Sequence, residues 1–149
     1  MSELPVGIAA HDSRRIGPGV AVGVTEAMIH DLVHAFYANV RADPAIGPIF
    51  NRLIGDRWDV HLAKLCDFWS SVLLMTGRFK GSPMAVHIGL AEIRPPHFAR
   101  WLQLFKQTAE ARCPPDAAAL FVAKSEMIGQ SLQLGIAAGR GELPRTAGQ

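Results

Sequence analysis

Apolar residues recur at intervals of three and four along most of the chain, which is the period of helices with one buried face. Thr25 stands at an N-cap position, and the pattern that follows predicts a helix to about Arg41. The apolar positions of this helix are Ile29, Leu32, Val33, Phe36, Tyr37 and Val40. Asp43-Pro44 ends it and starts a short helical turn toward Phe50.

A second long helix is predicted to open at Gly55-Asp56 and to end at the glycines and proline at positions 77, 81 and 83. Its apolar stripe consists of Trp58, His61, Leu62, Leu65, Phe68, Trp69, Val72 and Leu73. Residues 84–93 are predicted to form a short helix or turn that carries His87 and Leu90.

The Pro95-Pro96 pair is a natural first turn for the next helix, which Cys113-Pro114-Pro115 ends. The inward positions of this helix are Phe98, Trp101, Leu102, Phe105 and Ala109. The last helix runs from about residue 116 to 138, with inward positions at Leu120, Phe121, Met127, Ile128, Leu132 and Gly135. No stretch alternates with a period of two for long, so the pattern predicts an all-α fold with four substantial helices.

Glycine and proline gather at both ends of the chain, where no helical period is seen. We therefore predict a flexible leader over residues 1–23, a folded domain over 24–138 and a flexible tail over 139–149. The basic pair Arg14-Arg15 follows the weakly apolar stretch of the leader, whereas in a signal peptide it would precede it. This order favours a cytoplasmic protein.

Composition narrows the class of protein further. Of the 149 residues, 49% are hydrophobic and 19% are charged, against roughly 25% charged in an average domain. The formal charge of +2 is too balanced to favour nucleic acid, and no apolar run reaches the roughly 20 residues of a membrane span. The two cysteines, Cys66 and Cys113, are too few for a disulfide framework, and Cys66 is expected to be a buried free thiol.

Two histidines, His30 and His34, are spaced i, i+4 on the first long helix with Asp31 between them. The spacing resembles the paired histidines of zinc hydrolases, in which a carboxylate serves as base. Both side chains fall on the polar side of the helix and no third ligand is evident. A solvated surface is therefore the expectation, with a metal site as the alternative.

Three polar side chains instead lie within apolar stripes. His61 is a core histidine satisfied by hydrogen bonds, a metal ligand or a group facing a ligand pocket. Tyr37 and Trp101 raise a similar question, because a buried phenol needs a partner and an indole N–H only donates. His87, between the second and third long helices, is either a loop histidine or a single axial ligand, and His97 is either its rival or a capping residue.

Taken together and in order, these residues resemble a truncated haemoglobin of the group III (P-type) branch over roughly residues 24–138. The matching motifs are Phe36-Tyr37, Pro48-Ile49-Phe50, Trp58 with His61-Leu62, Phe68-Trp69, Phe79-Lys80-Gly81-Ser82-Pro83, His87 with Leu90, His97-Phe98, and Trp101-Leu102-Gln103-Leu104-Phe105. The chain departs from the family pattern in its leader.

The resemblance implies a two-over-two helical sandwich around b-type haem. It makes His87 the proximal iron ligand, places Tyr37, His61 and Trp101 on the distal side and packs Phe50 on the haem face. The candidates for the pocket wall are Phe36, Leu65, Phe68 and Phe98. In this arrangement donors from Tyr37 and Trp101 stabilise the partial negative charge of bound O2, and the apolar wall slows oxidation of the iron.

The function expected from this resemblance is reversible binding of O2, CO and NO, by a monomer or weak homodimer. Peroxidase-like or NO-detoxifying chemistry is an alternative that needs an electron donor, such as a separate reductase, since 149 residues leave no room for a reductase domain. A gas sensor would need an output partner. An all-α interaction module without a cofactor is the remaining alternative.

Overall fold

The computed structural model describes residues 16–80 and 93–139, and every regular element in this part of the chain is helical. The elements are the 3-10 turn η1 (Val20–Val22) and the α-helices α2 (Glu26–Ala42), α3 (Gly47–Ile54), α4 (Trp58–Leu74), α6 (Pro95–Arg112) and α7 (Pro115–Gly139). The all-α prediction is confirmed. The short helix or turn expected over residues 84–93, with His87, falls almost wholly on residues outside the described part.

Helix α2 begins where its sequence predicts. The hydroxyl of Thr25 accepts a hydrogen bond from the Met28 N–H at 3.1 Å, so it satisfies one of the free donors of the first turn. The helix ends at Ala42, one residue beyond the expected end. All six predicted apolar positions of this helix are buried: Ile29, Leu32, Val33, Phe36, Tyr37 and Val40.

Helix α3 is longer than the predicted turn, because it continues past Phe50 to Ile54. Its first residue, Gly47, lies against the end of α2: a Cβ atom there would be 2.6 Å from the Arg41 carbonyl oxygen. Gly55 then adopts a positive φ of 62° and caps α3 through its N–H bond to the Asn51 carbonyl.

Helix α4 therefore starts at Trp58, and the prediction that Gly55-Asp56 opens it was wrong because this glycine ends the preceding helix. The far end also differs from the prediction. The chain leaves the helix after Leu74, since Met75 takes the left-handed conformation with φ of 58° two residues before Gly77.

The C-terminal end of α4 is covered by residues 17–23, which the sequence analysis assigned to the leader. The Gly19 N–H donates to the Leu73 carbonyl at 2.8 Å, and a Cβ on Gly17 would lie only 2.1 Å from the same oxygen. Both glycines are buried. This contact gives an otherwise free carbonyl of the last turn of α4 a hydrogen-bond partner.

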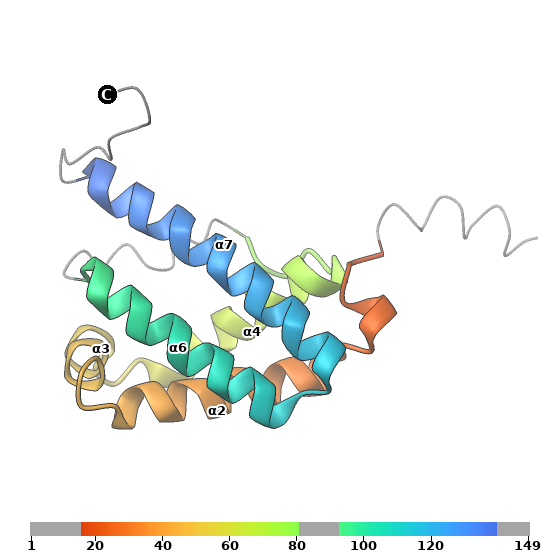
Figure 1. The fold of residues 1–149 in the computed structure, drawn as a ribbon, viewed down its shortest axis with the longest axis horizontal. Helices are drawn as coiled ribbons and strands as arrows, with labels where there is room; N and C mark the ends of the chain where they lie inside the picture. Colours follow the sequence, from red (N-terminus) through yellow and green to blue (C-terminus); the bar gives the residue numbers. More distant parts are fainter. Residues whose placement is uncertain (1–15, 81–92, 140–149) are drawn as a thin grey trace, which may run out of the picture.

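Helices α6 and α7 lie side by side (Figure 1) and pack closely on each other. Pro95-Pro96 form the first turn of α6, as predicted.

On α7 the buried positions are Ala117, Ala118, Phe121, Ser125, Gly129, Leu132 and Ile136. The prediction that Met127 faces inward was wrong. That side chain is 60% exposed, because it lies two residues from both Ser125 and Gly129 and so points to the opposite side of the helix.

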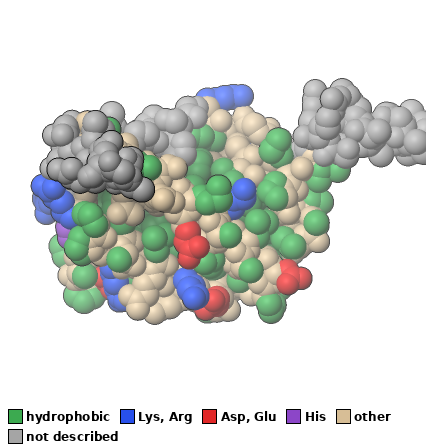
Figure 2. Space-filling model, turned by 45° about the horizontal axis from the view of Figure 1, so that its top comes forward, with side chains coloured by type: hydrophobic (Ala, Val, Ile, Leu, Met, Phe, Trp, Pro, Cys, Tyr) green, Lys and Arg blue, Asp and Glu red, His purple; other side chains and the backbone are tan. Residues whose placement is uncertain are grey.

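Helix α2 packs closely on α3 and α4 and also on α6, so it connects helices from the first and second halves of the chain. In the core, the Trp69 ring of α4 stacks on Phe105 of α6 at 5.4 Å and lies equally close to Phe121 of α7. On the face drawn in Figure 2, basic and acidic side chains are spread among the others and do not gather in a large patch of one sign. No described helix combines the length and the apolar character that crossing a membrane requires.

Candidate functional site

Polar side chains gather at one end of the aromatic core, around Tyr37 of α2. The Tyr37 ring lies 6.4 Å from Phe50 of α3, 5.9 Å from Trp58 of α4 and 5.9 Å from His61 of α4, measured between ring centroids. The His61 ring meets Tyr37 edge to face, at an interplanar angle of 85°. Helices α2 and α4 thus bring a phenol, an imidazole and an indole together, and α3 adds the Phe50 ring beside them.

Trp101 of α6 completes this group through a hydrogen bond with the Tyr37 side chain. Because an indole N–H only donates, the Tyr37 oxygen is the acceptor. Burial raises the pKa of the Tyr37 phenol well above its usual value, and the bond from Trp101 offsets part of that effect. The tyrosine therefore stays protonated at neutral and moderately alkaline pH, with its own O–H left to donate.

His61 is half-buried between two aromatic rings. Its centroid lies 5.8 Å from Trp58 and 5.9 Å from Tyr37, in edge-to-face contact with both, and its Nε2 atom is shielded from solvent. The histidine within the apolar stripe of α4 therefore lies beside the tyrosine within the apolar stripe of α2.

Trp58 is a member of this group that the sequence analysis placed in the stripe without a role. It is 5% exposed, and its indole N–H finds no acceptor among residues 16–80 and 93–139. The Arg41 guanidinium covers its face, 4.6 Å from the ring centroid. Trp58 shares the feature that distinguishes Trp101, a donor-only indole within an apolar stripe, so the sequence carries the same signal for both residues.

The four candidates for the pocket wall are all buried, and so is Phe50, which was expected to pack on the haem face: Phe36, Leu65, Phe68, Phe98 and Phe50. Phe36 meets Trp101 edge to face at 5.5 Å, so it backs the polar group from α2. Phe68 lies further along α4 and contacts Phe79 at 5.4 Å. Phe98 borders a recess of about 80 Å³ between the start of α6 and the end of α7, which Ile93 and Ile136 also line.

The histidines outside this group divide into three cases. His87 lies outside the described residues. His97 accepts a hydrogen bond from the Arg94 N–H at its Nδ1, 2.9 Å away, and so caps α6, which was one of its two predicted roles. His30 and His34 are exposed and stack with ring centroids 3.9 Å apart, while Asp31 pairs with Arg112 at 2.6 Å.

Two further expectations concern metal sites and thiols. Within residues 16–80 and 93–139 no cluster of three or more metal-ligating side chains is found. Cys66 and Cys113 are both free, as expected of Cys66, although Cys66 is half-buried where a fully buried thiol was expected. Burial raises the pKa of the Cys66 thiol to about 11, so it is protonated at neutral pH.

Comparison with known proteins identifies the family to which this arrangement belongs. No family model matches the chain. The group 3 truncated hemoglobin of Campylobacter jejuni is 31% identical to it over 113 residues, which are 74% of this chain and 89% of that protein. The crystal structure of the group III truncated hemoglobin from Campylobacter jejuni superposes with a TM-score of 0.65 at 30% identity and covers the same shares of the two chains. The chain belongs to the group III truncated haemoglobins.

Proposed function

We propose that this globin binds a b-type haem and uses it to hold diatomic gases, O2, CO or NO, reversibly, with His87 as the proximal iron ligand. The observation that carries the proposal is the contact of the Tyr37 phenol with the His61 imidazole at 5.9 Å, beside which the Trp101 indole bonds the Tyr37 oxygen. These polar groups lie in an apolar core, where leaving a polar group without a hydrogen-bond partner is costly.

The described residues fit a haem in two respects. Phe50, Leu65 and Phe98 are apolar and buried, as a flat and mostly apolar group requires. The Trp58 indole N–H is buried with no acceptor in the described part of the chain, and such a donor normally finds a partner in a bound group or an ordered water molecule.

The haem would supply an iron atom with one open position for the gas, and the protein supplies the surroundings. Tyr37 accepts the hydrogen bond of Trp101 through a lone pair of its oxygen. This bond orients the Tyr37 hydroxyl and leaves its O–H free to donate. A hydroxyl placed in this way stabilises a ligand that carries partial negative charge. His61 lies against the same tyrosine and contributes a ring nitrogen to this side.

The protein also excludes water from the polar group around Tyr37. Phe36, Phe50 and Trp101 are each no more than 7% exposed, so they keep the polar group away from solvent. A low-polarity surround strengthens the hydrogen bonds of the site and slows oxidation of ferrous iron. Both effects favour reversible binding of the gas.

The proximal assignment is tested by His87→Ala, with His97→Ala as the matched control. We expect His87→Ala to lose axial ligation, seen as a weakened and shifted Soret band after addition of haemin. His97→Ala should keep the wild-type spectrum, because His97 caps α6 through its bond to the Arg94 N–H. The assignment is wrong if His97→Ala loses the ligation and His87→Ala retains it.

A further inference from the structure

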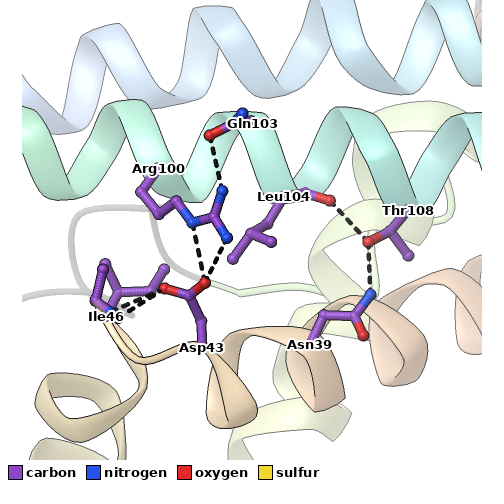
Figure 3. Close-up of polar contacts among 8 residues, drawn as sticks. Asn39, Asp43, Ile46, Arg100, Gln103, Leu104 and Thr108 are labelled. Atoms are coloured by element: carbon purple, nitrogen blue, oxygen red, sulfur yellow. Dashed lines mark hydrogen bonds and ion pairs between the residues drawn. The ribbon is translucent and has the colours of Figure 1, made fainter.

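Three polar contacts cross between α2 and α6: Asp43 with Arg100, Asn39 with Thr108 and Asp31 with Arg112. The residue number rises along α2 as its partner's number falls along α6, so the two helices run antiparallel. Figure 3 shows the first two contacts bridging the helices on the same side. The Tyr37–Trp101 hydrogen bond joins the same pair of helices.

Asp43 accepts more hydrogen bonds than any other side chain in these three contacts. Its side chain is 3% exposed, and its Oδ1 atom accepts hydrogen bonds from Arg100 Nε at 2.9 Å and Nη2 at 2.6 Å. The other oxygen, Oδ2, accepts from the backbone N–H groups of Ala45 at 3.0 Å and Ile46 at 3.1 Å. One carboxylate therefore binds the end of α2, the approach to α3 and the side of α6.

The elements joined in this way carry the distal side chains. Trp101 is the residue directly after Arg100, so the pair with Asp43 fixes the first turns of α6 next to the indole. Tyr37 is six residues before Asp43 on α2, about 9 Å along the helix axis. Ile46, held by Asp43, precedes the first residue of α3, which brings Phe50 to within 6.4 Å of the Tyr37 ring.

We infer that Asp43 and Arg100 are positioning residues for the distal site: their ion pair sets the register of α2 against α6 at which the Trp101 indole meets the Tyr37 hydroxyl. The inference rests on the proposed gas-binding function. It assigns to these residues an effect on ligand dissociation, exerted through Trp101 and without contact with the ligand.

The third contact provides a matched control. Arg112 donates to the two carboxylate oxygens of Asp31 through Nε at 3.0 Å and Nη2 at 2.6 Å, with the same donor atoms and nearly the same distances as the Arg100 pair. The side chains of Arg112 and Asp31 are about half exposed, at 47% and 46%. Asp31 is twelve residues from Asp43, which is about 18 Å along α2. An exposed pair at this distance should not affect the Tyr37–Trp101 bond.

The test compares Arg100→Met with Arg112→Met in the ferrous protein with CO bound, which is diamagnetic. The chain has three tryptophans, so its indole N–H groups give three proton–nitrogen NMR signals. We expect Arg100→Met to shift the Trp101 signal and to speed its exchange with water, while Arg112→Met leaves it unchanged. Should Arg100→Met fail to fold, Arg100→Lys, which keeps a cation at Asp43 with fewer donors, decides by the same criterion.

Dissociation of O2 gives the second readout. We expect Arg100→Met to raise its rate about five- to tenfold, as loss of one hydrogen bond predicts. In a Trp101→Phe background the same substitution should add nothing, because the indole through which it acts is gone. An unchanged indole signal, or an equal effect of Arg100→Met in both backgrounds, would overturn the inference while the haem spectrum still upholds the proposed function. Failure of the wild-type protein to bind haem would refute both.

Discussion

The hydroxyl of Tyr37 should distinguish O2 from CO, and Tyr37→Phe tests this with the removal of one oxygen atom. The ring keeps its contacts with Phe36 at 4.6 Å and with His61 at 5.9 Å, so the variant preserves the shape of the core. What it removes is a donor toward the ligand and the acceptor of the Trp101 N–H.

The magnitude follows from the charge on the ligand. Bound O2 has partial negative charge and bound CO has much less, so the hydrogen bond to O2 falls in the class of bonds to charged groups. Such a bond is worth about 1.5–3 kcal/mol, which is roughly a 10- to 150-fold change in a rate or equilibrium constant. We expect O2 to leave Tyr37→Phe faster by a factor in this range, and CO by less than about threefold.

Stopped-flow mixing of the O2 complex with CO, and of the CO complex with NO, measures both dissociation rates on one sample. Equal changes for O2 and CO would mean that the substitution alters the pocket as a whole. No change in either rate would mean that the Tyr37 hydroxyl does not reach the ligand. Either result refutes the reasoning given for Tyr37.

The same variant has a predicted cost in stability. Without the Tyr37 oxygen, the Trp101 indole N–H loses its acceptor while 7% exposed, which costs about 1–3 kcal/mol in the free energy of unfolding. Adding Trp101→Phe removes the stranded donor, so the double variant should be more stable than the sum of the single effects implies. Urea unfolding of the four proteins measures this, and strict additivity would contradict it.

Three further predictions follow from the structure. Arg100 lowers the pKa of the buried Asp43 carboxyl, so this group stabilises the fold above its unfolded-state pKa and the contribution is lost as the pH falls through the lower, folded-state pKa. The stability gap between wild type and Asp43→Asn in urea unfolding should therefore narrow on acidification, and a gap that widens would contradict the pairing. With its pKa raised to about 11, mainly by burial, Cys66 should react with iodoacetamide at pH 8 roughly a hundredfold more slowly than a free thiol, as peptide mapping can show. Gly17→Ala should cost about 1–3 kcal/mol in urea unfolding, because its Cβ would meet the Leu73 carbonyl oxygen at 2.1 Å, and a variant of unchanged stability would argue against that close contact.

Hydrophobic spacing alone predicted most of the helices, because an apolar stripe with a period near 3.6 leaves few other structures open. Thr25 marked the start of α2 correctly, since its side chain bonds a backbone group only three residues away. The period also placed Tyr37, His61 and Trp101 on inward faces, although it gave no indication that the tyrosine and the tryptophan bond each other.

What the sequence left open depends on contacts between distant parts of the chain. Asp43 and Arg100 are 57 residues apart, and an aspartate before a proline suggests only a turn or a helix end. The exposed Met127 is in a helix that is apolar on most sides, where the period alone does not decide which face is buried. The boundary between α3 and α4 depends on the positive φ of Gly55, which sequence alone assigns equally well to either helix.

Haem binding is the central claim, and a haemin titration followed by absorption spectroscopy tests it most directly. The account predicts that the purified wild-type chain takes up one equivalent of haemin and, after reduction and addition of CO, shows the sharp Soret band of a histidine-ligated ferrous haem. A colourless chain that binds no haemin, or one whose ferrous form gives no CO spectrum, would contradict it.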